Sequence, residues 1–194
     1  MKRIISLIIA LVLCSALLIS CGDAGYTEDE IKNTAKELIE ASLELNEIYF
    51  GEGLPVSDES SVGSALYAPV TGECKYHSTS EIKAATEKVF TGDYCKILFQ
   101  RGFEGTSLES SEEKVVYARY IDDFDGRLTA RRDLKETSLT TGRTYDYDSI
   151  KVEKMKKTEA VISVQSQVDG KADLIITLTL KLEENGWRLD TPTY

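Results

Sequence analysis

The sequence predicts an α+β fold in which a long amino-terminal helix and short helices pack on a curved antiparallel sheet. Three observations support it: helical spacing of apolar residues over 28–50, two shorter helical segments after it, and strand-like alternation beyond residue 113. Helices that precede a run of strands are typical of this fold class. With 194 residues, 42% of them hydrophobic, the chain can build a core, and we expect residues 27–194 to form one domain.

The long helix is predicted for residues 28–50. Thr27 and Glu30 match a capping box, in which a hydroxyl and a carboxylate three positions apart satisfy free amides of the first turn. Mostly apolar side chains then recur at helical spacing, and they are Ile31, Ala35, Leu38, Ile39, Ser42, Leu45 and Tyr49. Because one such stripe must be buried, we expect this helix to pack on the sheet.

Two short helices are predicted at 80–90 and 92–100. Ser78 and Glu81 offer a second capping box, and a turn that contains Gly92 separates the two segments. The stretch before Ser78 has no clear period, and a short strand is predicted within it, around residues 65–70.

The strands are predicted from alternation with a period of two. They are expected at 114–121, 127–134, 148–156, 158–168, 172–183 and 187–190. Residues 122–126, Asp169-Gly170 and Asn185-Gly186 have the composition of tight turns. We expect these strands to form one antiparallel sheet with one covered face.

This order of elements resembles the cystatin-like cone fold of the nuclear transport factor 2 type. The resemblance rests on the long first helix, on helices that precede strands, and on a final strand that carries Trp187 after a tight turn. Such folds often enclose a pocket between the sheet and the helices, so the resemblance implies that Tyr117, Arg119 and Trp187 line a pocket. An inward Arg119 would hold a carboxylate, an outward one would pair with nearby acids, and Trp187 also suits the core.

Residues 1–21 have the layout of a bacterial lipoprotein signal. Lys2 and Arg3 precede an uncharged apolar run, and Leu18-Ile19-Ser20-Cys21 resembles a lipobox. The resemblance implies that residues 1–20 are a signal peptide and that Cys21 carries diacylglycerol. Residues 21–26 would then tether the domain to the cell membrane, facing away from the cytoplasm. An ordinary signal peptide and an uncleaved anchor are the alternatives.

Composition argues against several classes of partner. A net charge of −10 disfavours nucleic acid, which requires clustered Lys and Arg. His77 is the single histidine, so a histidine-rich zinc site is not expected. Residues 121–132 have Ile121 and Arg132 where a calcium loop needs oxygen ligands at its two ends. We therefore expect neither a metal nor a cofactor.

The two cysteines that follow Cys21 leave two interpretations open. Outside the cytoplasm, a disulfide between Cys74 and Cys95 is chemically permitted, and closing that loop could add about 3 kcal/mol of stability. The alternative is two separate, buried or half-buried thiols.

The sequence shows no catalytic constellation around its serines, its cysteines or His77, which falls in a loop expected to be exposed. We therefore expect a non-catalytic envelope domain that binds a small molecule, glycan, peptide or envelope protein. In one alternative, resemblance to ketosteroid isomerases and dehydratases would give Asp133, Asp190 and Tyr117 roles in an enzyme pocket. In the other, the order of elements resembles secreted bacterial inhibitors of cell-wall endopeptidases, which block a cleft.

Overall fold

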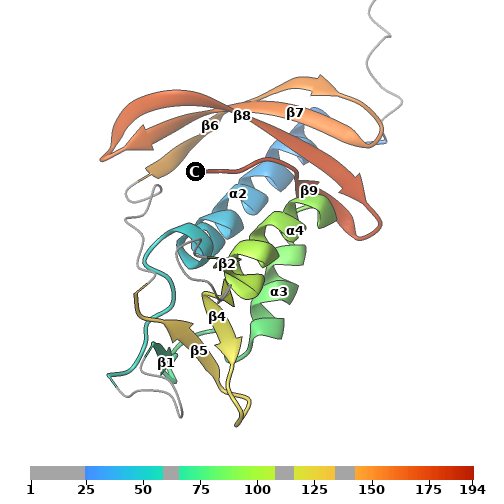
Figure 1. Ribbon diagram of the computed structural model, residues 1–194. Helices are drawn as coiled ribbons and strands as arrows, with labels where there is room; N and C mark the ends of the chain where they lie inside the picture. Colours follow the sequence, from blue (N-terminus) through green and yellow to red (C-terminus); the bar gives the residue numbers. More distant parts are fainter. Residues whose placement is uncertain (1–24, 59–65, 108–115, 134–142) are drawn as a thin grey trace, which may run out of the picture.

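The computed structural model describes residues 25–58, 66–107, 116–133 and 143–194, and it has an α+β fold (Figure 1). Its helices are α2 (Glu28–Phe50), α3 (Thr79–Glu87), α4 (Gly92–Phe99) and the π-helix η1 (Gln100–Glu104). Its strands are β1 (Tyr67–Pro69), β2 (Thr106–Ser107), β3 (Val116–Tyr117), β4 (Tyr120–Asp122), β5 (Leu128–Arg131), β6 (Arg143–Met155), β7 (Glu159–Val168), β8 (Lys171–Glu183) and β9 (Gly186–Leu189).

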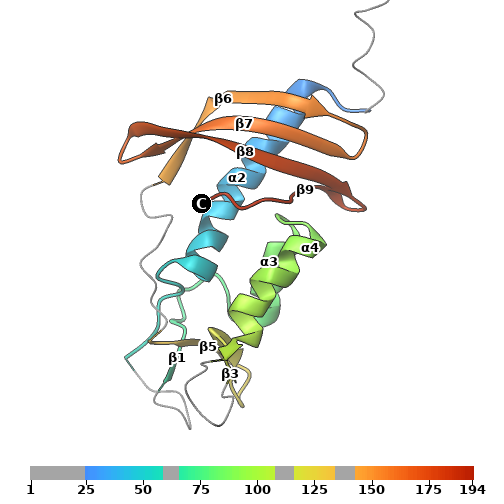
Figure 2. The ribbon, with the colours of Figure 1, turned by 45° about the horizontal axis from the view of Figure 1, so that its top comes forward.

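Helix α2 begins and ends where the sequence predicts. The amide of Glu30 donates to Thr27 Oγ1 at 3.2 Å, and the amide of Thr27 donates to Glu30 Oε2 at 2.7 Å, which completes the capping box. Its 23 residues span about 35 Å at 1.5 Å per residue. This length allows the two ends of the helix to contact different sheets (Figures 1 and 2).

The expectation of one antiparallel sheet is wrong. Strands β6, β7, β8 and β9 form a four-stranded antiparallel meander, β1, β5 and β4 form a second sheet in that order, and β2 pairs with β3 alone. Figures 1 and 2 show the meander over the amino-terminal part of α2 and the three-stranded sheet near its other end. Alternation predicts strands but not their partners, and the segment predicted as one strand at 114–121 is divided between two sheets.

The β7–β8 hairpin has the tight turn that its sequence predicts. Asp169 and Gly170 have φ of 51° and 72°, the two positive values that a type I′ turn requires. This turn sets the pairing of β7 with β8, which runs from Val168 opposite Lys171 to Glu159 opposite Lys181.

The short helices lie beside α2, with one feature that the sequence did not predict. Ser78 caps α3 and Thr91 caps α4, each by accepting from an amide three residues later. After Phe99 the chain widens into the π-helix η1, where Gly102 faces Tyr49 of α2. A Cβ at Gly102 would lie 2.7 Å from Tyr49 Cε1, so only glycine permits this approach.

The core lies between α2, the short helices and the sheets. Its fully buried side chains come from all three parts, for example Ile39, Leu98 and Leu180. Residues 190–194 leave β9 and enter the space between the meander and α2, where Thr193 is completely buried. That space is therefore filled by the chain itself.

Candidate functional site

Arg119 and Trp187, two of the residues predicted to line a pocket, lie at opposite ends of α2. Arg119 contacts carbonyls at the carboxyl end of the helix. Trp187 lies edge-on to Tyr26, just before the first turn, with ring centroids 5.4 Å apart. Tyr117 belongs to β3. Since Arg119 and Trp187 are separated by the length of the helix, they do not line one pocket.

Arg119 is a buried guanidinium that closes the carboxyl end of α2. Its side chain is 5% exposed and donates to the carbonyls of Tyr49 and Gly51 and to the hydroxyl of Tyr120. Tyr120 in turn donates to the Ile48 carbonyl at 2.9 Å. The orphan carbonyls at a helix end carry partial negative charge, so a cation placed there is stabilising.

Trp187 is a core residue. It is 5% exposed and belongs to the same apolar cluster as Leu180 and Ile162. Its position on β9, paired with Leu182 of β8, places the indole against the start of α2.

The two cysteines of the described chain are free thiols. Cys95 is buried and its thiol donates weakly to the Phe90 carbonyl at 3.5 Å, and burial raises the pKa of Cys95 to about 12. A thiol that stays protonated is a poor nucleophile and metal ligand. Cys21 lies outside the described residues.

The residues considered for catalysis are spread over the molecule. Asp190 accepts from Thr91 Oγ1 at 2.7 Å and pairs with Lys181 Nζ at 2.5 Å. Asp133 pairs with Arg131 at 2.6 Å. His77 lies in the loop before α3, where its carbonyl accepts from the amide of Leu128. Asp190 follows β9 of the four-stranded sheet and Asp133 follows β5 of the three-stranded sheet, so the two carboxylates considered together with Tyr117 belong to different sheets.

The turn between β4 and β5, which we name the β4–β5 turn (residues 122–127), has a fixed backbone. Asp123 Oδ1 accepts from the amides of Asp125 and Arg127, both at 2.9 Å, and its Oδ2 accepts from Arg127 Nε at 3.2 Å. The hydrogen bond from the backbone amide of Arg127 is the main cause that lowers the pKa of the Asp123 carboxyl. Asp122 ties the root of the turn to α3, because it accepts from the amide and the hydroxyl of Thr79 at 2.9 and 2.7 Å.

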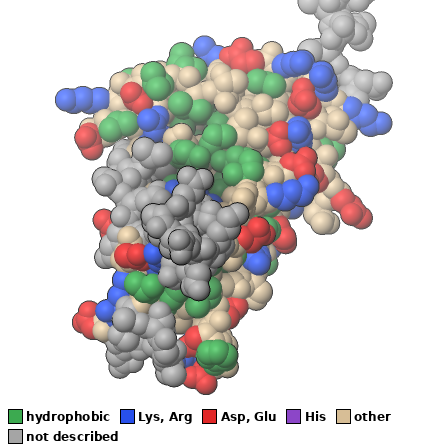
Figure 3. Space-filling model, viewed as in Figure 1, with side chains coloured by type: hydrophobic (Ala, Val, Ile, Leu, Met, Phe, Trp, Pro, Cys, Tyr) green, Lys and Arg blue, Asp and Glu red, His purple; other side chains and the backbone are tan. Residues whose placement is uncertain are grey.

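The β4–β5 turn presents a phenylalanine to solvent. Phe124 is fully exposed, more so than the other large apolar side chains that reach the surface of the described chain, of which Ile175 comes next at 70%. In Figure 3, acidic side chains surround a hydrophobic one at the lower end of the molecule, where Figure 1 draws this turn. Single apolar side chains are common on protein surfaces, and Phe124 differs from them in that an ordered turn holds it in water.

Two grooves meet at Tyr76, and the smaller of them adjoins the β4–β5 turn. One of about 500 Å³ lies between α2 and α3, over Ala41 and Ala85, and the Glu44–Lys75 ion pair of 2.7 Å stands at its rim. The other, of about 330 Å³, is lined by Pro69, His77, Arg127 and neighbouring residues. Tyr76 lines both, so the two grooves share one wall.

Neither a metal centre nor a membrane span is found in the described ranges. Within residues 25–58, 66–107, 116–133 and 143–194, metal-ligating side chains do not gather in groups of three. None of the helices in those ranges combines the length and the apolar character that a bilayer crossing requires.

The comparisons with known proteins add no assignment. No protein-family model matches the chain, and no curated protein matches its sequence significantly.

Proposed function

We propose that this protein is a lipid-anchored, extracytoplasmic domain that binds another protein through the β4–β5 turn. The observation that carries the proposal is the fully exposed Phe124 on a turn whose backbone is held by Asp123 and Asp122. Because the backbone of the turn is already ordered, binding would cost only the side-chain freedom of Phe124, and aromatic residues supply a large share of interface energy.

The chemistry around Phe124 defines the surface that would receive it. The turn carries Asp122, Asp123 and Asp125 against the single cation Arg127, and the whole chain has a net charge of −10. A complementary partner therefore has an apolar pocket with lysine or arginine side chains at its rim.

Inhibition of a cell-wall hydrolase is the second candidate, and the shape of the turn favours it. A narrow turn that projects an aromatic side chain suits entry into an enzyme cleft better than contact with a flat surface. The partner would then be a hydrolase whose cleft is apolar within and cationic at its edge.

The lipid anchor and the cone-like fold belong to the same proposal. The lipobox at 18–21 supports the anchor and the location outside the cytoplasm. The long helix packed under a four-stranded meander supports the resemblance to the nuclear transport factor 2 type. The second sheet, β1-β5-β4, departs from it.

Phe124→Ala tests the binding role of the turn. Cell-wall hydrolases extracted from the producing bacterium are assayed by the clearing of purified cell walls, with the protein added at increasing concentration. Because loss of an interface hot spot costs about 2 kcal/mol or more, the variant should need at least about 30-fold more protein for the same inhibition.

Ile97→Ala is the matched control, since Ile97 is an exposed apolar residue on α4, 59% accessible, away from the turn. It should inhibit like the unchanged protein, and both variants should unfold at unchanged temperature. If the unchanged protein does not slow clearing, inhibition is ruled out as the function. Equal potency of the Phe124 variant would remove the turn from the interface.

Cys21→Ser tests the anchor. The variant should lose incorporated palmitate and leave the membrane fraction, because one thiol carries the diacylglycerol. Cys14→Ser, in the apolar run, should keep both properties. A Cys21 variant that remains acylated and membrane-bound would contradict the assignment of the lipid site.

A further inference from the structure

Residues 190–194, which we name the strap, cross from β9 to α2 beneath the four-stranded sheet. The strap starts from a fixed point, because Asp190 is held by Lys181 and Thr91 and its amide donates to the Thr179 carbonyl at 2.8 Å. Thr191 Oγ1 accepts from the amide of Thr179 at 3.1 Å. The strap thus begins as an extension of the β8–β9 pairing and then turns inward.

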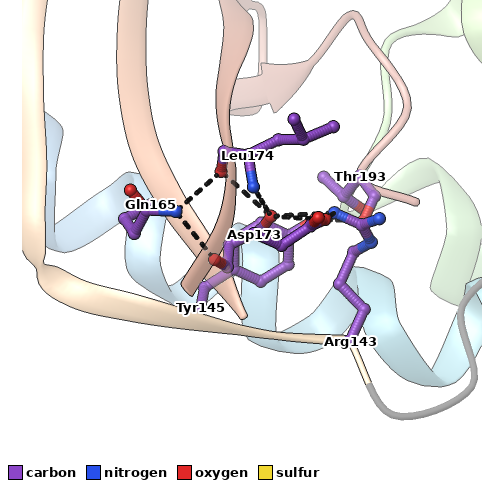
Figure 4. A network of polar contacts seen from close by, with 7 residues as sticks. Arg143, Tyr145, Gln165, Asp173, Leu174 and Thr193 are labelled. Carbon is purple, nitrogen blue, oxygen red and sulfur yellow. Dashed lines mark hydrogen bonds and ion pairs between the residues drawn. The ribbon is translucent and has the colours of Figure 1, made fainter. Parts of the chain in front are cut away.

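Three buried polar side chains meet Thr193 at the inner end of the strap. They are Ser42 and Asn46 of α2 and Tyr145 of β6, and we name the space between them the slot. Tyr145 donates to the backbone carbonyl of Thr193. Figure 4 shows Tyr145 and Thr193 together with the Arg143–Asp173 ion pair of 3.0 Å, which lies at this end of the sheet.

The slot selects a hydroxyl group. Ser42 Oγ already donates to the Ile39 carbonyl at 2.7 Å, so in its 2.6 Å contact with Thr193 Oγ1 the serine accepts. Thr193 Oγ1 also accepts from Asn46 Nδ2 at 2.8 Å. One atom must therefore donate and accept at once, which a threonine or serine hydroxyl does and a methyl, carboxylate or ammonium group does not.

An aromatic contact follows the hydroxyl. The Tyr194 ring packs on Phe50 with centroids 4.4 Å apart. Burial is the main cause that raises the pKa of Tyr94 in α4, and the neighbouring Tyr194 raises it further. The strap therefore joins the meander, α2 and α4 through two adjacent residues.

We propose that the slot is a binding site for an extended peptide segment with Thr or Ser followed by an aromatic residue, and that residues 191–194 occupy it as an intramolecular ligand. Its recognition elements are side chains of α2 and β6, which lie far from the strap in sequence. A segment of the same chemistry competes with the strap for the slot. This site is separate from the β4–β5 turn and does not depend on the function proposed for it.

The test weakens the strap and supplies its sequence in trans. In the Thr193→Val, Tyr194→Ala variant of the full chain, the acetylated and amidated peptide Asp-Thr-Pro-Thr-Tyr should raise the unfolding temperature by about 3 °C at peptide concentrations well above its dissociation constant. The matched peptide with Val at the second threonine should give no shift. The unchanged protein should respond to neither peptide, because its slot is filled.

No shift of the variant with the threonine peptide at 10-fold steps up to millimolar concentration would overturn the proposal, as would equal shifts with both peptides. Where the double variant does not fold, Thr193→Val alone is titrated with the same two peptides, and the same results decide. A shift of the unchanged protein as large as that of the variant would place peptide binding outside the slot.

Discussion

Replacing Arg119 with Met is expected to lower the free energy of unfolding by about 3 kcal/mol, because each hydrogen bond from a charged donor is worth about 1.5–3 kcal/mol. The substitution keeps the apolar stem but removes the donors to the Tyr49 and Gly51 carbonyls. The Gly51 carbonyl would lose this donor at the end of α2, whereas the Tyr49 carbonyl would keep its hydrogen bond from Arg101 Nε at 3.0 Å. Urea unfolding measures the change, and the midpoint should fall while the slope stays constant.

Arg127→Met is the control for this prediction. The Arg127 side chain is about half exposed, and after its loss the Asp123 carboxylate, 8% exposed and 3.2 Å away, would keep the two amide hydrogen bonds that hold it. Surface ion pairs contribute about 0–1 kcal/mol, so this variant should unfold close to the unchanged protein. Arg119→Lys keeps the charge but not the planar guanidinium, so its urea midpoint should lie between those of the two Met variants. Equal midpoints for the two Met variants would show that Arg119 does not stabilise the helix end.

Gly102→Ala is expected to lower the free energy of unfolding by about 2 kcal/mol through overpacking. The added Cβ would meet Tyr49 Cε1 at 2.7 Å. Tyr49 is fully buried, its hydroxyl is 2.9 Å from Thr86 Oγ1, and its ring meets Phe103 edge-on, so it has little freedom to retreat. Thermal unfolding followed by circular dichroism gives the change directly.

Gly92→Ala provides the comparison, because nothing lies within 4 Å of a Cβ built at Gly92. Alanine at this first residue of α4 should be neutral or slightly stabilising, by up to about 1 kcal/mol. If the two alanine variants melt at the same temperature, the close approach of η1 to α2 does not constrain the fold.

Local rules predicted the helices and turns well. The capping box at Thr27 and the Ser78 cap placed the starts of α2 and α3 to within one residue, since each hydroxyl bonds an amide only three residues away. The box predicted at Ser78 is incomplete, because Glu81 accepts from the amide of His77. The Asp169-Gly170 turn was equally local. The π-helix was not predicted, because it depends on Tyr49 lying over Gly102, a contact between segments distant in sequence.

The sequence pattern did not predict contacts between residues that are distant in sequence. Alternation left Arg119 either inward or outward on a strand, but Arg119 lies between β3 and β4, and its buried guanidinium donates to helix-end carbonyls. Ser42 was predicted to share the apolar face of α2, which is correct. Its buried hydroxyl bonds Thr193, a contact that nothing nearby in the sequence identifies.

The sequence predicted only part of the candidate interface. The composition of residues 122–126 predicted a turn, and the turn is there. Asp123 accepts hydrogen bonds from the amides of Asp125 and Arg127, and these bonds fix the backbone of the turn that carries the exposed Phe124. A phenylalanine in a sequence is expected to be buried, so composition alone points the other way.

The length of α2 sets the separation between the proposed lipid anchor and the β4–β5 turn. The tether joins the domain at Tyr26, at the start of the helix, whereas the root of the β4–β5 turn is fixed near its other end through Arg119 and Tyr120. The helix alone separates the end of the tether from the root of the turn by about 35 Å. With the proposed anchor at one end of α2, the proposed binding turn lies at the opposite end of the domain.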